Sequence, residues 1–334
     1  MIFEPRDLPK VELHVHLDTC ISYHCAKMLM PELTLKEYNC HFIASSKCAD
    51  LGEFLSKITP QLSLLQSKRA LLLAVDDIFD QLHADSVIYA ELRLAPLLHL
   101  NQQLTAEVVV ETILKGMQEG YKVYGIEARL ILCTLRHFTE YQSLETAKLV
   151  KKYLHRGVVA LDLAADEARY PLDNHIRAFD FVRSYGGNCI AHAGEALDYR
   201  SVNETLTKLQ VTRIGHGVKS IENKATVDKL IEQNIHLEVC PGCNIICNVY
   251  DKIEEHPVDR LLRSGVAISI NTDARTIADT SLNKEYHQLN RVFGWGYEEF
   301  RLCNLNAVKA CFAELELKNK LKEIIIKASK KPCK

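Results

Sequence analysis

Short runs of β-branched and apolar residues alternate with amphipathic stretches along most of the chain. Runs of this kind predict buried strands, and the stretches between them predict helices. Eight strands are expected, at residues 11–16, 87–93, 127–133, 158–164, 188–192, 212–216, 235–239 and 266–271. Helices are expected between them, for example at 106–119, 143–154, 173–185, 221–233 and 256–264. Eight strands joined by crossover helices predict an α/β fold, a (β/α)8 TIM-type barrel.

Two segments exceed what a minimal barrel needs. About seventy residues separate the first two strands, and the apolar set Leu51, Phe54, Leu55 and Ile58 recurs there at helical spacing. We expect a helical lid insertion at about 30–80, because a segment that follows a strand emerges at the catalytic face; packing of an extra helix on the barrel rim is the alternative. Extra C-terminal helices are expected after residue 280, ending in a solvated tail. Because no linker divides the chain, residues 1–334 are expected to form a single barrel domain.

Charge and composition restrict the partners. The chain has 41 basic and 43 acidic residues, a net charge of −2, and no basic stretch interleaved with aromatic residues. These features argue against nucleic acid and favour a small-molecule partner. Its N-terminal residues are charged, no run approaches the length of a membrane span, and its twelve cysteines are scattered. We therefore expect a cytoplasmic protein with reduced, mostly buried thiols.

Histidine and aspartate side chains lie at the ends of predicted strands, where barrel enzymes place their chemistry. His14 and His16 are two residues apart on the first strand, so both imidazoles share one face. His192 ends the fifth strand, and Asp273 follows the eighth, which lies beside the first in a closed barrel. Three imidazoles and one carboxylate around a point predict a Zn²⁺ site. Taken alone, the His14–His16 pair also fits a purely structural role.

Two further residues lie near this group. Glu195 follows His192 by three residues, and it is either a solvated carboxylate or an acid or base whose pKa burial would raise. His216, at the end of the sixth strand, is either a fourth imidazole ligand or a group that orients a metal-activated hydroxide, and we favour the second. Cys240, Cys243 and Cys247 resemble half of a zinc knuckle without a second C-x-x-C pair, so buried cysteines are the better interpretation.

Several segments together resemble the adenosine deaminase family of the amidohydrolase superfamily, nearly from end to end. They are LPKVELHVHLD (8–18), YAELRLAP (89–96), LDLAADE (161–167), HAGE (192–195), RIGHG (213–217), LEVCP (237–241) and INTDA (270–274). The resemblance implies one zinc ion per chain, bound by His14, His16, His192 and Asp273, with Asp273 also counted among the catalytic residues. It implies that Glu195 protonates the purine N1 and that His216 assists the attacking hydroxide.

The resemblance also implies a substrate pocket. Asp18 matches the position that holds the ribose 5′-hydroxyl, Phe54 and Leu55 match the lid, and Gly194 of the HAGE segment is placed beside the substrate. Binuclear relatives carry a lysine at the end of strand 4, where this chain has Asp162 and Leu163, so one metal is the simpler expectation.

Three departures from the family pattern surround the ring of the substrate. Ala274 stands where the family has a second aspartate that meets purine N7. Ala165 replaces a glycine whose amide meets N3, and Thr19 replaces the glycine after HLD. We expect hydrolysis of adenosine to inosine and ammonia as the first candidate. The alternatives are a modified adenine nucleoside, another amino-heterocycle, or a zinc-containing nucleoside-binding homologue of low activity.

Overall fold

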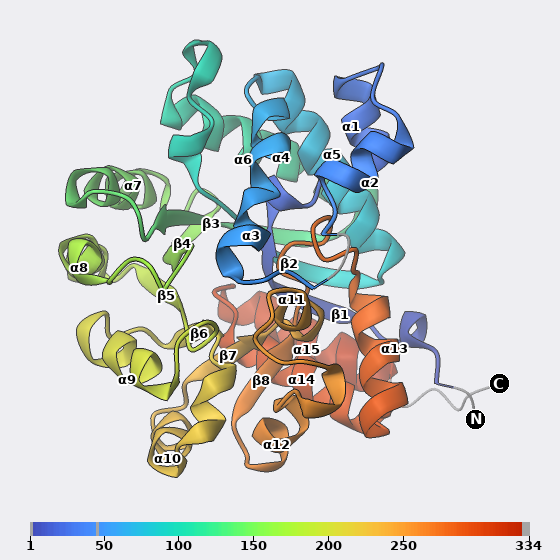
Figure 1. Cartoon of the computed structure of the whole chain (residues 1–334), viewed down its shortest axis with the longest axis vertical. Coiled ribbons are helices and arrows are strands. Elements are labelled where there is room, and N and C mark those ends of the chain that lie inside the picture. The colour runs from blue at the N-terminus through green and yellow to red at the C-terminus, as the bar shows by residue number, and fades with distance from the viewer. Residues whose placement is uncertain (1–2, 45–46, 329–334) are drawn as a thin grey trace.

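Eight parallel strands form the centre of the molecule (Figure 1). The computed structural model describes residues 3–44 and 47–328. The strands are β1 Lys10–His16, β2 Val87–Leu94, β3 Glu127–Leu135, β4 Val158–Ala164, β5 Asn188–Ala193, β6 Arg213–His216, β7 His236–Val239 and β8 Ala267–Ile270. They pair in chain order, and a parallel bridge between Val15 and Asp273 joins the last strand region to β1. The predicted (β/α)8 barrel is confirmed.

Helices cover the strands, most of them as an outer ring (Figure 1). Within the described residues they are α1 Tyr23–Leu29, α2 Leu35–His41, α3 Leu51–Ser56, α4 Ile58–Leu64, α5 Lys68–Ala84, α6 Ala106–Tyr124, α7 Glu140–Tyr153, α8 Ile176–Ser184, α9 Tyr199–Lys208, α10 Lys224–Glu232, α11 Pro241–Ile246, α12 Val258–Arg263, α13 Leu282–Phe293, α14 Tyr297–Ala310 and α15 Leu315–Ala328. Side-chain caps fix several starts, such as the capping box of Thr34 with Glu37 in α2. None of the helices in this part of the chain has the length and hydropathy that a membrane span requires.

The long connection between β1 and β2 is helical, as the spacing predicts. Helices α1 to α4 precede α5, which packs with α6 in the outer ring and against β2. The long amphipathic α5 is the crossover helix of the barrel itself, so the insertion consists of α1 to α4. It therefore lies closer to β1 in the chain than the expected 30–80. The side chains of Leu51 and Phe54 on α3 are buried against α11. This contact brings the insertion over the carboxyl ends of the strands.

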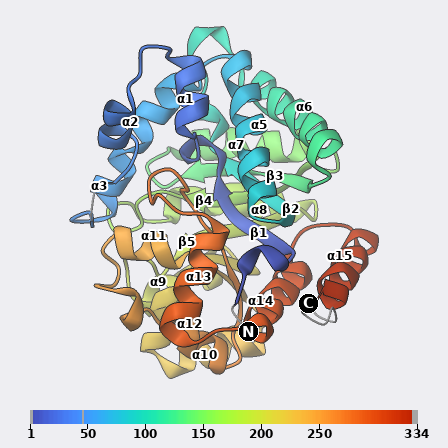
Figure 2. The same cartoon turned by 90° about the vertical axis from the view of Figure 1, so that its right-hand side faces the viewer.

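The opposite end of the barrel is closed by the C-terminal helices. Leu317, Leu321 and Ile325 of α15 are buried in one cluster with Val11 and Leu13 of β1. Figure 2 shows α14 and α15 beside β1. The expectation of a solvated tail is thus wrong for 318–328, whose apolar positions recur at helical spacing and cover the barrel; the remainder of that tail, 329–334, lies outside the described residues.

Candidate active site

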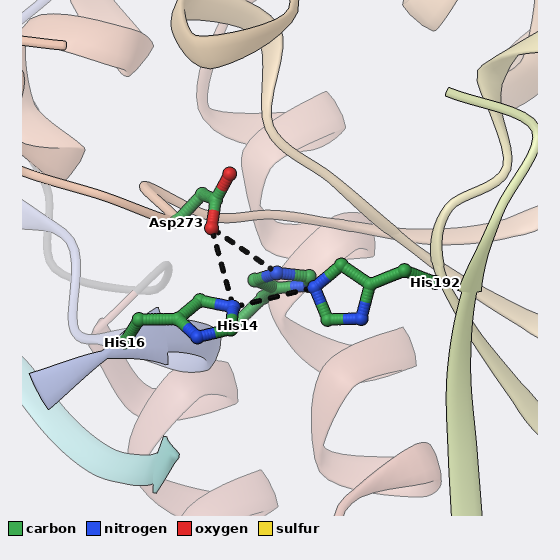
Figure 3. A group of neighbouring side chains, drawn as sticks. All are labelled: His14, His16, His192 and Asp273. Carbon is green, nitrogen blue, oxygen red and sulfur yellow. Dashed lines mark hydrogen bonds and ion pairs between the residues drawn. The ribbon is translucent and has the colours of Figure 1, made fainter. Parts of the chain in front are cut away.

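The four predicted ligands meet at the carboxyl end of the barrel (Figure 3). His14 and His16 lie on β1, His192 lies on β5, and Asp273 follows β8. Asp273 is held against β1 by two backbone hydrogen bonds, from its own N–H to His14 O (2.8 Å) and from the His16 N–H to its carbonyl (2.9 Å). The ligand atoms of all four side chains lie within 4.8 Å of one another. The expected contact between the first and last strand regions is therefore present.

The donor set fits a metal ion. Nε2 of His14 is buried without a hydrogen-bond partner in the described residues, and Oδ1 of Asp273 lies 3.4 Å from it. Burial lowers the pKa of His16 to about 3, so this imidazole is neutral, the form that coordinates a cation. Although burial opposes ionisation, the close approach of His14 and the other neighbouring imidazoles holds the pKa of Asp273 well below its usual range. Three imidazoles and one carboxylate thus face a common point.

Two buried carboxylates orient the histidine rings. Glu238 of β7 lies 2.9 Å from Nδ1 of His14, and Asp162 of β4 lies 3.2 Å from Nδ1 of His192. Both rings are therefore turned so that Nε2 points toward the common centre, as in carboxylate–histidine–metal arrangements. Arg93 of β2 bridges the two carboxylates, at 2.9 Å from Asp162 and 2.7 Å from Glu238. All of these side chains are fully buried, so the barrel interior is an ion-pair network at this level.

Glu195 lies just beyond β5, in a turn held by Glu167. The Glu167 carboxylate accepts hydrogen bonds from three backbone donors of this turn, the N–H groups of Gly194 (3.1 Å), Glu195 (2.7 Å) and Leu197 (2.9 Å). Burial, and then the nearby Asp273 and Glu167, raise the pKa of Glu195 well above its usual value. A raised pKa favours the protonated form of this carboxyl, which can donate its proton.

Asn244 of α11 joins Glu195 to His216. Its Nδ2 amide donates to Oε1 of Glu195 (3.1 Å) and lies 3.2 Å from Nδ1 of His216, while its carbonyl faces Nε2 of His256 at 3.2 Å. The backbone N–H of Val258 donates to Nδ1 of His256, which leaves the proton of that ring on Nε2. The amide of Asn244 is thereby fixed with its nitrogen toward the active site.

This chain of hydrogen bonds assigns the tautomer of His216. Burial lowers the pKa of His216 well below its usual value, so the ring is neutral. Because Nδ1 accepts from Asn244, the single proton lies on Nε2, which faces Oε2 of Glu195 at 3.5 Å and Oδ2 of Asp273 at 4.0 Å. His216 is outside the group of four ligand side chains, so the arrangement favours the orienting role over that of a fourth imidazole ligand.

A cavity of about 390 Å³ opens above these residues. Its floor contains His16, His192, Glu195, His216 and Asp273. One wall is formed by side chains of the lid helices, including Phe54 and Leu55, and the opposite wall by small or apolar residues at the ends of β2 to β4. Other predicted pocket residues, namely Asp18, Thr19, Ala165 and Ala274, also line the cavity.

Asp18 is placed in this cavity by His99. The two side chains approach to 3.4 Å, and the other ring nitrogen of His99 lies 2.9 Å from Leu65 O, just beyond α4. Both side chains are buried. The carboxylate of Asp18 is thus tied to the chain segment that carries the lid.

Two predicted substrate contacts need separate comment. Gly194 is not among the described residues that line the cavity, and its N–H is already bonded to Glu167 and Ser201. Its left-handed φ of 65° turns the chain so that Glu195 faces inward, which gives Gly194 a role in the turn, and its contact with substrate stays a prediction. Ala165 does line the cavity, but with a φ of 77°, which is strained for a residue with a Cβ.

Comparison with known proteins decides the family. The model of the adenosine deaminase family matches residues 9–328. The chain belongs to the adenosine deaminase family. An adenosine deaminase of Clostridium botulinum (strain Kyoto, type A2) is 35% identical over 325 residues, which cover 95% of this chain and 97% of the relative. This adenosine deaminase family member is therefore a hydrolytic deaminase of the amidohydrolase superfamily, a group whose members use a metal.

Solved structures share the fold of this adenosine deaminase family member. Adenine deaminase of Arthrobacter aurescens superposes with a TM-score of 0.89 at 23% identity, covering 97% of this chain and 99% of that one. The N6-mAMP deaminase of Arabidopsis gives a TM-score of 0.85 at 23% identity, covering 96% and 98%.

Sequence reasoning missed the residues that hold the catalytic groups in place. They are Arg93, Glu238, Glu167, Asn244, His256 and His99. Asp162 was noted only because it stands near the position where binuclear relatives carry a lysine. A signal was present for those on strands: Arg93, Asp162 and Glu238 are charged residues inside apolar strand runs, which is costly unless they are paired. No comparable signal marks His256, because its role depends on a loop that approaches α11 only in the folded chain.

Proposed function

We propose that this chain hydrolyses the amino group of adenosine, or of a close adenine nucleoside, with one Zn²⁺ per chain. The observation that carries the proposal is the meeting of a protonated carboxyl, a neutral imidazole and a four-residue metal group at the floor of one cavity. Such a floor can hold a ring in place, deliver a proton to it and activate water beside it.

His14, His16, His192 and Asp273 would hold the metal. Imidazole and carboxylate donors suit Zn²⁺, and a set of this kind leaves a position open. When bound there, the ion supplies Lewis-acid chemistry that makes water a nucleophile near neutral pH. Glu238 and Asp162 keep the two imidazoles turned toward the ion, and Arg93 neutralises the two carboxylates.

Glu195 supplies the proton. Asn244 donates to Oε1, so the proton of the carboxyl lies on Oε2, the oxygen nearer to Nε2 of His216. We assign Glu195 to protonate the ring nitrogen next to the amino-bearing carbon, which makes that carbon electrophilic. The carboxylate that results can then take a proton from the attacking water and pass it to the departing ammonia.

His216 orients the attacking water. Its Nε2–H is a hydrogen-bond donor in the neutral ring, so it can bond to the oxygen of the nucleophile and hold it beside the substrate carbon. The same assignment leaves Nε2 without a free lone pair. His216 is therefore not the base that removes the proton from water.

The walls select the substrate. Phe54 and Leu55 would cover the ring and ribose, and Asp18 would accept a hydrogen bond from the 5′-hydroxyl. The methyl group of Ala274 offers no partner for purine N7, so an adenine compound other than adenosine is the second candidate. The relatives of the same fold include enzymes for adenine and for N6-mAMP, which makes both compounds part of the test.

The test is release of ammonia, or of methylamine in the case of N6-methyl-AMP, by the zinc-loaded protein. The panel contains adenosine, deoxyadenosine, 5′-modified adenosines, adenine and N6-methyl-AMP, with Glu195→Gln as the control protein. We expect release with adenosine or a close nucleoside, and its loss in the control. Absence of release across the panel, with zinc content confirmed, would contradict the proposal.

A further inference from the structure

Cys243 of α11 and Cys247, which caps the end of this helix, lie directly behind the catalytic acid. Sγ of Cys243 is 3.8 Å from Sγ of Cys247, one helical turn later. Cys243 also donates a hydrogen bond to Oδ2 of Asp273, at 2.8 Å. Cys243 and Cys247, part of the incomplete zinc knuckle in the sequence, therefore have a third donor within reach. This donor is the carboxylate of Glu195, from the turn after β5.

These three side chains have the donor types and spacing of a metal site. Their ligand atoms lie within 4.8 Å of one another, and all three side chains are buried. Two sulfurs bound tetrahedrally at about 2.3 Å stand about 3.8 Å apart, which is the separation found here. Sulfur donors select soft and borderline cations over Mg²⁺ and Ca²⁺.

The site is reached through the substrate cavity. Glu195 and Asp273 line that cavity, whereas the two thiols lie one layer behind them. A cation that enters the cavity therefore meets the carboxyl of Glu195 before the sulfurs. The group shares Glu195, but none of its other members, with the residues that carry out the reaction.

We propose that Glu195, Cys243 and Cys247 form an inhibitory site for a second, thiophilic divalent cation. The inhibition rests on the proposed function, because it follows from the role of Glu195 as the proton donor. Binding displaces the protons of both thiols and of the Glu195 carboxyl to solvent, and the ion takes their place. Glu195 is then a ligand without a proton, so the first proton transfer to the ring stops. Removal of the ion by a chelator restores the enzyme.

Cd²⁺ added to the zinc-loaded enzyme is the probe. We expect loss of ammonia release at micromolar free Cd²⁺, with two thiolate ligands per ion seen as cadmium–thiolate absorption in the ultraviolet. The zinc content stays at its starting value, which separates the second site from exchange at the first. A weak chelator returns the rate to its starting value. The absorption measures binding of Cd²⁺ alone. It therefore tests the metal site even if the assigned substrate or the role of Glu195 is wrong.

Cys247→Ser and Cys243→Ser are the test variants, each compared with its own rate before Cd²⁺ is added. Loss of a direct ligand should raise the concentration needed for half inhibition by at least about 10- to 100-fold and remove the two-thiolate absorption. Cys40→Ser, which changes an exposed thiol, should behave like the original protein. If either test variant fails to fold, Glu195→Gln serves instead, with weaker Cd²⁺ binding expected by absorption.

Three results would overturn the proposal. The first is inhibition that persists unchanged in both cysteine variants. The second is inhibition accompanied by loss of zinc and no thiolate absorption. The third is the absence of Cd²⁺ binding to the zinc-loaded protein. Two-thiolate binding without inhibition would show that the two cysteines bind the ion but that the inhibitory role is wrong. Glu195 would then be either not a ligand or not the proton donor, and the rate of the Glu195→Gln variant decides between these two.

Discussion

The floor of the active-site cavity is made of polar residues that hold one another, whereas Phe54, Leu55 and Ala274 give its walls an apolar surface without such partners. On the floor, His14, His192 and His216 each have a named partner that fixes the ring. On the walls, Phe54 and Ala274 contribute only shape. We infer that the residues of the floor carry out the reaction, whereas the residues of the walls select the substrate. A change in the floor should alter the rate of every substrate, and a change in the walls should alter the choice among them.

Replacement of Glu195 by Gln should have the largest effect. The amide cannot deliver the proton, so we expect kcat to fall by about 10²- to 10⁴-fold. Steady-state ammonia release measures the rate, and elemental analysis measures zinc, which should be retained. A variant with near-original kcat would remove Glu195 from the role of proton donor and leave the floor without its acid.

Replacement of Asn244 by Leu tests whether the floor depends on its supporting hydrogen bonds. The change keeps the volume but frees both Glu195 and His216, so kcat should fall by about 10- to 100-fold with a small change in KM. The pH dependence of kcat should shift as well, because Oε1 of Glu195 loses the hydrogen bond that lowers its pKa.

Asn203→Ala is the matched control for that variant. Asn203 is half-buried, its amide donates to the hydroxyl of Thr226, and both residues lie outside the cavity lining. It should leave both kcat and its pH dependence unchanged. Equal losses in the two variants would mean that Asn244 acts through stability rather than through the catalytic pair.

Ala274→Asp tests whether the walls of the cavity determine the choice of substrate. A buried carboxyl there holds its proton and can donate to purine N7, so kcat/KM for adenosine should rise about tenfold. Ala274→Leu adds bulk without a donor and should lower the same ratio. No gain with Asp would show that this wall is organised around a different adenine compound.

Replacement of Phe54 by Ala should have the smallest effect on chemistry. We expect KM to rise about fivefold, or about 1 kcal/mol, with kcat nearly unchanged, because part of the apolar cover is lost. Phe42→Ala is the control, since Phe42 is equally buried in the insertion but outside the cavity lining. It should lower the free energy of unfolding and leave KM unchanged. A fall in kcat with Phe54→Ala would break the separation of floor and walls.

The barrel and the residues at its strand ends could be predicted because local patterns encode them. Alternation of apolar runs and helices gave the eight strands within a few residues, and strand periodicity put His14 and His16 on one face. The turn role of Gly194 and the buried face of α15 depend on partners distant in the chain, which periodicity does not reveal. The tautomer of His216 depends on Asn244, His256 and Val258, from two segments that are distant from it in the chain, so only the folded arrangement could assign it.

The double hydrogen bond between Asp273 and β1 also bears on how the chain folds. It closes a loop of nearly 260 residues, at an entropic cost of about 5 kcal/mol, and it completes the metal group in the same step. An ion held by His14, His16 and Asp273 would link the two edges of the sheet, and it would bind the closed barrel in preference to the open one. The metal group would therefore stabilise the junction between β1 and the segment after β8. Release of the ion and opening of this junction would then be coupled.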